Sequence, residues 1–502
     1  MVTLLIGSER NIQFFDVLSK TNVSNSYSSI VNPLRYFVEP IAGLSYILGM
    51  DFDWIIPFII IYIVLRFLYL FLKRRNAISA PFRISFLNPL QNLITFTFTV
   101  LMVMLIIVGV IILIGYIFFG FFIINLNFMR IIQVGTKFSF LFIIVKFLIT
   151  FSKKIENRLN LTNLKSPPLK FSLKNNLKLK LIKSIRKEAF YFVGFLVLFL
   201  ELNIILISIP LPVHRINTSL NEDEFLIDFH GHTIYSDGWL TPEQRVLWYM
   251  EHGINIAAFS DHDNLNGAHI ANQFVQRFKL DFKVITAVEY TDHQNDIHLN
   301  YYGIDELVVP LESKTQNGPI AMNVSDMIKY IKGKGGFVIV NHYNENLNDN
   351  GDIGSPYSLE DLMKWGVDGF EILNAGTYQG DILREFCLNN SLICLGGSDI
   401  HTNEELHTFV RLKLKNPMNK TVENIFQTLH NNTHQVIQIY LYPKLFTLPD
   451  NNFLGFTLFE KSLNYFFHIG KLKIISWIIW STSIYVIIST VIIKKKRDIH
   501  NE

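Results

Sequence analysis

The sequence predicts an α/β barrel inserted between membrane-spanning helices. Two observations lead to this fold class. First, strand-like and helix-like segments alternate over residues 225–430, as in a parallel sheet wrapped by helices, and we expect a closed barrel rather than an open sheet. Second, long apolar runs flank this region. Apolar residues make up 50% of the chain and charged residues only 17%, a composition typical of a protein with a large membrane portion.

The chain has 502 residues, more than one hydrophobic core normally supports, so we expect more than one structural unit. We predict a membrane region at 1–219, a soluble metallohydrolase domain at 220–435, and a C-terminal part at 436–502 with a linker, one span and a basic tail. The net charge of +3 is too small to indicate a nucleic-acid partner, and we expect none.

Five apolar runs are long enough, or nearly so, to cross the roughly 30 Å hydrocarbon core of a bilayer as helices. They are 54–72, 94–124, 134–151, 190–213 and 474–493. Lysine and arginine residues follow the first, third and fifth runs, including a basic loop at 152–188, so five crossings place these clusters on one face. The positive-inside rule assigns that face to the cytosol. This predicts an integral, multi-pass membrane protein whose soluble domain lies on the non-cytosolic side.

The elements of the soluble domain follow from its hydrophobic periodicity. The expected strands are 225–230, 254–259, 282–287, 297–302, 336–340, 369–373, 392–395 and 408–414. The expected helices are 242–252, 267–278, 324–332, 359–365, 379–389 and 422–430. Thr241 before Pro242 is typical of a helix start, and so is Ser325 before Asp326.

Nine residues of metal-ligand type gather near the ends of the expected strands. They are His230, His232, Asp237, His262, Glu289, His298, His342, Asp399 and His401. Because the carboxyl ends of barrel strands meet at one mouth, we expect these side chains to converge there. His230 and His232 are two residues apart, which places both imidazoles on one side of an extended strand. Mixed imidazole and carboxylate ligands suit Zn²⁺, Mn²⁺ or Fe better than Mg²⁺.

Several short runs carry a family resemblance. The run 228–238 (Asp-Phe-His-Gly-His-Thr-Ile-Tyr-Ser-Asp-Gly) and the run 259–263 (Phe-Ser-Asp-His-Asp) resemble the opening signature of the PHP (polymerase and histidinol phosphatase) family of metal-dependent phosphoesterases. Further matches are the runs 287–289, 298–303, 340–342 and 397–401. The resemblance covers about 225–430, under half of the chain, and includes every ligand position of the family's three-metal form. Asn341 and Tyr343 flank His342 where the family commonly has a small residue and a proline.

This resemblance implies a distorted (β/α)₇ barrel, similar to a TIM barrel, that holds two or three divalent metal ions. The implied ligands are His230, His232, Glu289 and Asp399 for the first ion, Glu289, His298 and His342 for the second, and Asp237, His262 and His401 for the third. Glu289 would be the bridging carboxylate. The implied chemistry is hydrolysis of a phosphate ester by a metal-activated water.

Three further residues have possible roles beside the ligands. His293 and Asp263 are candidates for the proton donor to the leaving group, with a solvent-facing loop position as the alternative for each. Asp261 is a candidate for orienting a liganding imidazole, with a helix cap as the alternative.

The expected function is that of a membrane-anchored, metal-dependent phosphoesterase acting on a phosphorylated small molecule or lipid. One alternative is a hydrolase that cleaves a carbamate or amide bond on the same metal ions. A second alternative is a receptor or transporter whose metal-dependent domain only senses a ligand. The intact set of nine ligand-type residues favours catalysis, because a sensor need not keep them all.

Overall fold

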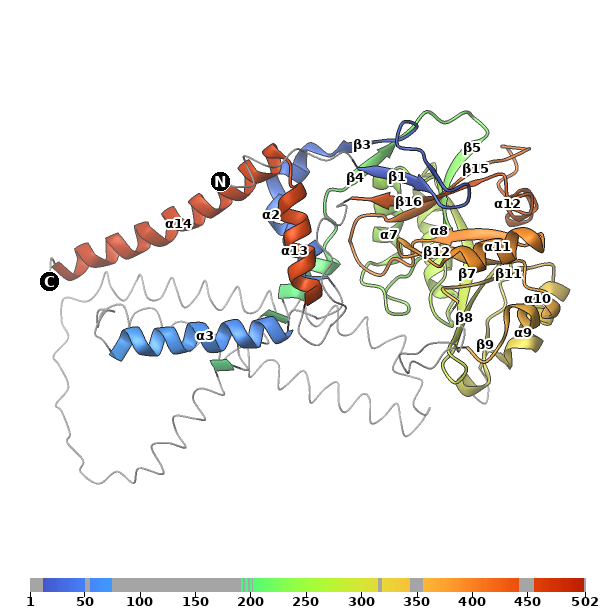
Figure 1. Ribbon diagram of the computed structural model, residues 1–502, viewed down its shortest axis with the longest axis horizontal. Coiled ribbons are helices and arrows are strands. Elements are labelled where there is room, and N and C mark those ends of the chain that lie inside the picture. The colour runs from blue at the N-terminus through green and yellow to red at the C-terminus, as the bar shows by residue number, and fades with distance from the viewer. Residues whose placement is uncertain are drawn as a thin grey trace, which may run out of the picture.

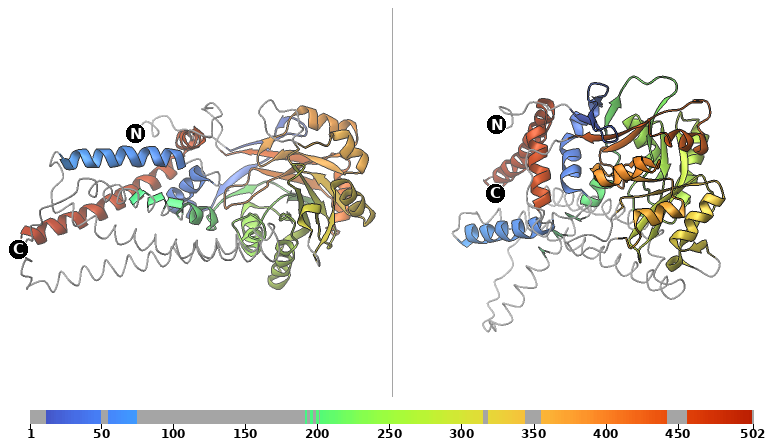
Figure 2. Two further views of the ribbon diagram at one scale, coloured as in Figure 1. Left: turned by 90° about the horizontal axis from the view of Figure 1, so that it is seen from below. Right: turned by 45° about the vertical axis from the view of Figure 1, so that its right-hand side comes forward.

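The computed structural model describes residues 12–49, 55–74, 202–314, 318–343, 355–441 and 456–500, together with the pairs 191–192, 195–196 and 199–200. An α/β part and a helical part lie next to each other (Figure 1). In each view of Figures 1 and 2, the helices α3 (Ile55–Arg74) and α14 (Lys471–His500) extend away from the α/β part.

The α/β part is built on one mixed sheet. Its main strands are β5 (Glu224–Asp228), β6 (Ile256–Phe259), β7 (Lys283–Asp292), β8 (Ile297–Tyr302), β11 (Phe337–Val340), β12 (Gly369–Asn374), β14 (Ile393–Gly397), β15 (Thr408–Lys413) and β16 (Gln435–Tyr440). The strand order is β13-β12-β11-β8-β7-β6-β5-β15-β16-β1-β2, and β14 pairs with β12. All the strands expected from the sequence are therefore present; β8 has its expected bounds, and the ends of the others are shifted.

The expectation of a wholly parallel sheet is wrong at two strands. β8 runs antiparallel to both β7 and β11, and β15 runs antiparallel to β5 and β16. The physical reason at β8 is the connection: only residues 293–296 join it to β7, whereas a parallel pair needs a crossover of about a dozen residues or more. A short connection therefore makes β7 and β8 a hairpin.

Strand pairing does not close the barrel that the sequence predicts. Among the described strands, no continuous ladder joins the β12–β14 end of the sheet to β5. Beyond the strands, the two ends are joined by an isolated parallel bridge between Gly231 and Ile400 and by a hydrogen bond from the Asp399 N–H to the His230 carbonyl. That bridge lies just beyond β5 and β14, so it brings the segments carrying the first and last candidate ligands together.

Helices cover the sheet close to their predicted positions. They are α7 (Pro242–His252), α8 (Asn266–Phe278), α9 (Val324–Gly333), α10 (Leu359–Trp365), α11 (Asp381–Asn389) and α12 (Val422–Leu429). The helix start at Thr241 is confirmed: its side chain accepts a hydrogen bond from the Gln244 N–H, and Gln244 reaches back in a capping box. The start at Ser325 is wrong by two residues, because Asn323 caps α9.

The N-terminal segment contributes strands that the sequence does not predict. β1 (Gln13–Asp16) pairs antiparallel with β16, and β2 (Thr21–Asn22) pairs with β1. β3 (Ser28–Val31) pairs with β4 (His214–Asn217) just ahead of β5. β16 itself was not predicted either, and the other unpredicted strands are short: β9 (Val308–Pro310), β10 (Ile320–Met322) and β13 (Thr377–Tyr378). Residues on both sides of the long apolar region therefore meet in the α/β part.

The helical part contains α2 (Pro33–Leu48), α3, α13 (Phe456–His468), α14 and the helix at 202–208, with α2 packed against α13 and α14. The expected spans 54–72 and 474–493 coincide with α3 and α14. The spans 94–124 and 134–151 lie outside the described residues, and 190–213 lies partly outside. Within the described ranges, no helix combines the length and the apolar character that crossing a membrane requires.

Candidate metal centre

Eight of the nine predicted ligands form three overlapping groups at one edge of the sheet. The groups are His230, His232, Glu289 and Asp399; His232, Asp237, His262 and His401; and His262, Glu289 and His298. In each group, one ligand atom per residue lies within 4.8 Å of the others. In the order just given, we call them the first, third and second groups, after the ions for which the family resemblance implies these ligands. Residues distant in the chain thus meet in one pocket.

The first group has the geometry of a coordination shell. His230 Nε2 lies 3.0 Å from His232 Nε2, 3.0 Å from Glu289 Oε2 and 3.4 Å from Asp399 Oδ1. His232 Nε2 lies 3.1 Å from each of the same two carboxylate oxygens. Four ligands at about 2.0–2.1 Å around a tetrahedral metal ion are roughly 3.3 Å apart. The donor atoms therefore enclose a space of the right size for one divalent ion.

Glu289 connects the groups because five imidazoles surround its carboxylate. Oε2 faces His230, His232 and His262, while Oε1 faces His298 at 2.8 Å and His342 at 3.5 Å. A carboxylate whose two oxygens face different sets of donors is suited to bridge two ions. His342, which the sequence assigns to the second ion, thus lies beside the second group, while His262 contributes to it as well.

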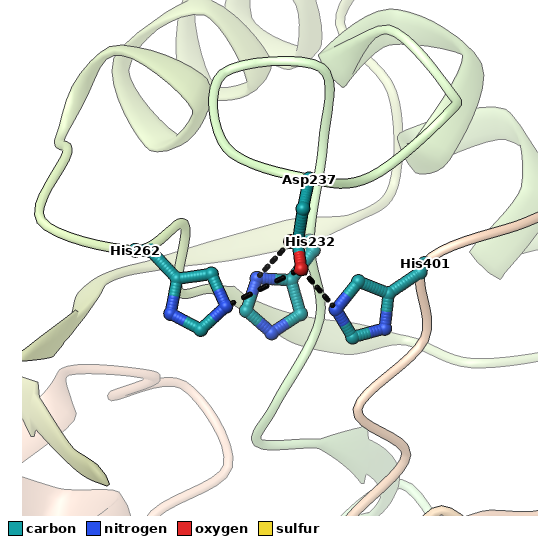
Figure 3. Close-up of side chains that lie close together, drawn as sticks. All are labelled: His232, Asp237, His262 and His401. Atoms are coloured by element: carbon teal, nitrogen blue, oxygen red, sulfur yellow. Dashed lines mark ion pairs between the residues drawn. The ribbon is translucent and has the colours of Figure 1, made fainter. Parts of the chain in front are cut away.

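The third group is arranged around Asp237 (Figure 3). Its carboxylate points toward three imidazoles: Oδ2 lies 3.1 Å from His401 Nε2 and 3.5 Å from His262 Nε2, and Oδ1 lies 3.7 Å from His232 Nδ1. The side chain of Asp237 is 46% exposed, whereas those of His230 and His232 are fully buried. The centre therefore opens to solvent on the Asp237 side.

The reversed direction of β8 explains why His298 belongs to the centre. His298 is the second residue of β8, and its partner across the ladder is Thr291 near the end of β7. In a parallel strand, a residue at this position would lie at the opposite edge of the sheet. Because β8 is antiparallel, its beginning lies beside the end of β7.

Left-handed backbone conformations occur at three residues of the centre. Asp399 has φ +49°, Asp263 has φ +47° and His342 has φ +24°. Residues other than glycine rarely adopt positive φ, and such strain is often found at functional sites. Asp399 and His342 each follow the end of a strand by two residues, and their side chains lie among the candidate ligands.

Electrostatics in the metal-free centre couple the imidazoles to the carboxylates. Burial lowers the pKa of His230, but the Glu289 and Glu371 carboxylates outweigh burial and raise this pKa well above its usual range. Burial likewise lowers the pKa of His232, whereas hydrogen bonds to Asp399 and Glu289 raise it to about 10. Burial raises the pKa of Glu289, but the surrounding imidazoles hold it well below the usual range. Without a metal ion, protons on the imidazoles therefore balance the acidic charge.

The residues that orient the ligands were not predicted from the sequence. Glu371, in the middle of β12, is fully buried, and its Oε1 lies 3.0 Å from His230 Nδ1. Thr291 Oγ1 lies 2.6 Å from His262 Nδ1, and the Asn341 amide donates to Glu289 Oε1 at 3.0 Å. A Cβ atom at Gly397 would overlap the Glu371 carboxylate and the His230 side chain. The available signal was one acidic residue inside an apolar strand, because buried carboxylates need partners.

We expect the substitution Glu371→Gln to weaken metal binding by about 10–100-fold, the usual effect of losing an outer partner of a liganding histidine. The carboxylate accepts the proton on His230 Nδ1 and so fixes the tautomer that presents Nε2 to the ion. Titration of the metal-free full-length protein with Zn²⁺ or Mn²⁺ measures this change.

Asp368→Asn is the matched control for Glu371→Gln. Asp368 is also a buried acid on the same chain segment, but it contacts Lys332 and the Val338 N–H rather than a candidate ligand. Its loss should lower thermal stability and leave metal affinity unchanged. Wild-type affinity in Glu371→Gln would show that His230 needs no such partner.

The roles considered for Asp261, Asp263 and His293 have different outcomes. Asp261 neither caps a helix nor touches an imidazole: it accepts hydrogen bonds from Thr233 N–H and Oγ1 and from Ser236 Oγ, and thereby orders the turn after β5. Asp263 accepts from the Thr291 N–H, and burial raises its pKa well above the usual range. His293 is exposed, with its ring centroid 6.3 Å from that of His298. Asp263 and His293 thus both lie near the centre.

The donor set fits divalent transition metals. Imidazole nitrogen and carboxylate oxygen together are the ligands that Zn²⁺, Mn²⁺ and Fe accept, whereas all-oxygen shells suit Mg²⁺. Histidine ligands normally donate their second ring nitrogen to an acceptor, as His230 does to Glu371. Both the spacing and the outer partners are therefore those of metal sites.

Comparison with known proteins gives partial similarities. No family model and no curated protein matches the chain. Among solved structures, it is similar to a two-domain protein of Bacteroides vulgatus containing a predicted PHP-like metal-dependent phosphoesterase (20% identity over 47% of this chain and 70% of that chain, TM-score 0.35). It is also similar to a lesion-specific endonuclease of Pyrococcus furiosus (15% identity over 42% of this chain and 57% of that chain, TM-score 0.32). A third similar structure is an amidohydrolase of Chromobacterium violaceum with bound sulfate and no metal (17% identity over 35% of this chain and 87% of that chain, TM-score 0.25).

Proposed function

We propose that this chain is a metal-dependent hydrolase of the PHP type that cleaves phosphate esters. The observation that carries the proposal is the first group: four donor atoms from three segments of the chain, mutually spaced like the corners of a coordination shell. Two or three divalent ions bound here would activate a water and stabilise charge on phosphoryl oxygens.

The candidate residues have different roles according to their burial and position. His230, His232 and Glu289 are buried and rigidly placed, which suits holding ions, whereas Asp237 and His342 face the open side where a substrate enters. Thr291 and Glu371 keep the imidazoles oriented. Asp263 and His293 are the candidate proton donors to the leaving group, because both lie at the edge of the pocket.

The test is hydrolysis by the full-length protein, metal-stripped and then reloaded with Zn²⁺, Mn²⁺ or Fe²⁺. The full chain is required because β1 and α2 pack on the α/β part, so a fragment from 220 onward would lose contacts. The panel contains phosphomonoesters, phosphodiesters including an oligonucleotide and a phospholipid headgroup, and, for the alternative chemistry, a carbamate and an amide. Turnover of a phosphate ester supports the proposal.

Two results would replace the proposal by one of its alternatives. Turnover confined to the carbamate or the amide would assign the same centre to the other hydrolase chemistry. Stoichiometric metal binding with tight binding of a phosphate compound and no turnover would indicate a sensor. Retention of full phosphoesterase activity after complete metal removal would refute the metal-dependent mechanism.

We further propose that the protein is anchored in a membrane, with the α/β part on the non-cytosolic side. The support comes from the five apolar runs in the sequence and from exposed apolar side chains on the helical part, such as Phe67 on α3 (71% exposed) and Ile479 on α14 (58% exposed). Protease treatment of sealed vesicles tests the orientation. Cleavage of the basic loop 152–188 and of the α/β part from the same side would contradict it.

A further inference from the structure

The segment 402–407 connects the candidate ligand His401 to β15, and it also contacts the helical part. Asn403 is buried, and its N–H donates to the Ile207 carbonyl at 3.1 Å. Its side-chain amide donates to the carbonyls of Leu206 and Ile209. These carbonyls belong to the last turn of the helix at 202–208, where the helix itself supplies no partner. Asn403 therefore binds the end of that helix.

A serine on α2 completes this contact. Ser45 Oγ lies 3.1 Å from Asn403 Oδ1 and 3.0 Å from the Leu206 carbonyl. Ser45 and Asn403 are both buried. The residue two positions after His401 is thus fixed between two helices rather than being free in a loop.

Glu405 forms a second, charged contact with α2 and also contacts β4 and α7. Its Oε1 lies 2.9 Å from Arg35 Nη1 and 2.8 Å from His214 Nδ1, and its Oε2 accepts from the His214 N–H and lies 3.2 Å from His252 Nε2. Arg35 lies on α2. A buried carboxylate with this many donors has its position strongly fixed, because each lost partner leaves buried charge uncompensated.

The charged contact extends through the helical part. Arg35 also pairs with Glu39 at 2.9 Å, and Glu39 Oε1 accepts from the Tyr465 hydroxyl of α13 at 2.7 Å. Lys473 of α14 lies 3.0 Å from His214 Nε2. We call this set the Glu405 network: Arg35, Glu39, His214, His252, Glu405, Tyr465 and Lys473. It joins α2, α13 and α14 to the chain segment that follows His401.

The same segment begins in the third group. The Ile400 carbonyl accepts from the His232 N–H at 3.1 Å, and the His401 carbonyl accepts from the Trp239 N–H at 2.7 Å. His401 itself lies 3.1 Å from Asp237. Only one residue separates His401 from Asn403, so a displacement of the helices is transmitted to this imidazole. Metal ligands must keep their distances within about 0.2 Å.

We propose that the helical part positions His401 through Asn403 and Glu405, and thereby sets the metal affinity of the third group. This inference rests on the proposed metal-dependent function and concerns regulation of the same centre. The first group is linked to the helices less directly: the Asp399 N–H donates to the His230 carbonyl, and Glu289 lies within β7. It shares His232 with the third group, and His401 Nδ1 lies 2.8 Å from the Asp399 carbonyl oxygen. A change in the helices should therefore alter the third group more than the first.

The experiment compares metal binding by full-length variants. Arg35→Gln removes the charge partner of Glu405, and Ser45→Ala removes one hydrogen bond to Asn403 while leaving every charge in place. Titration with Mn²⁺ resolves the bound equivalents. We expect one equivalent to bind about tenfold more weakly in each variant, the low end of the effect of outer residues on metal sites, with a smaller change in the affinity of the other equivalents.

Glu224→Gln is the matched control. Glu224 pairs with Arg411 at 2.9 Å and joins β5 to β15 without touching the helical part. It should lower thermal stability and leave all equivalents intact. The inference is overturned by wild-type Mn²⁺ affinities in Ser45→Ala and in any folded Arg35→Gln protein, or by loss of the same equivalent in Glu224→Gln. A wild-type protein that binds no metal would instead refute the proposed function.

Discussion

Replacing Glu289 by Gln is expected to reduce metal affinity and hydrolytic activity by more than about 100-fold, beyond the loss typical of an outer partner. The amide keeps the shape of the side chain but lacks the charge that five imidazoles share. Both the first and second groups depend on it, so more than one ion should be lost. Elemental analysis together with the phosphoester assay measures both effects.

Glu306→Gln serves as the control for the Glu289 substitution. Glu306 is 44% exposed and pairs with Lys334 rather than with any candidate ligand, so its replacement should leave metal content and activity unchanged. Full metal occupancy in Glu289→Gln would show that the imidazoles around position 289 do not bind ions, and the proposed function would fail with it.

The second large effect concerns pH. In the metal-free protein, carboxylates raise the pKa of His232 to about 10 and that of His230 well above the usual range. Ions bind only neutral imidazoles, so metal binding must displace protons over the whole range below these pKa values. We expect affinity at the first group to fall by at least about tenfold for each pH unit of acidification, because one released proton gives this slope.

Calorimetric titration with Zn²⁺ in buffers of different ionisation enthalpy counts the released protons directly. His430→Gln is the control, since His430 lies near Asp368 and away from the centre; the proton count should not change. Metal affinity that is constant between about pH 6 and pH 9 would contradict this prediction, because imidazoles with raised pKa values would then not be ligands.

The same shifts determine the stability of the metal-free protein. An imidazole whose pKa is raised by folding stabilises the folded state fully at pH values below its pKa in the unfolded chain. This contribution is lost as pH rises through its pKa in the folded protein, which is about 10 for His232. The lowered pKa of Glu289 acts in the opposite direction: its contribution is present above the unfolded pKa and is lost as pH falls through the folded pKa. These two contributions therefore stabilise the metal-free fold between the lowered pKa of Glu289 and the raised pKa of His232.

Local features of the fold could be predicted from the sequence because their causes are local. The α7 start at Thr241 and Pro242 depends on side chains within one helical turn. Helix and strand positions in 225–430 follow from periodicity, and most ends agree to within a few residues. Only residues 288–296 separate the strands expected at 282–287 and 297–302, fewer than a parallel crossover needs, so these two strands could have been expected to form a hairpin in place of a parallel pair.

Other features required the folded chain. β1 joins the sheet through β16, whose partner residues lie more than four hundred positions later in the sequence. Glu371 orients His230 from 141 residues away, and Asn403 and Glu405 meet helices from the N-terminal region. The hydrophobic periodicity of a short segment cannot predict such contacts, because each residue of a pair fits the pattern of its own strand or helix whether or not the other is present.

The sequence by itself determined which residues have ligand chemistry and that nearly all of them lie where strands end. Only the tertiary structure decided how they are shared: Glu289 at the centre, His262 between two groups, and His401 tied to the helical part. The physical reason is that imidazole and carboxylate are ligands by their own chemistry, whereas a shared oxygen, an outer partner or a fixed loop exists only when distant segments occupy one pocket.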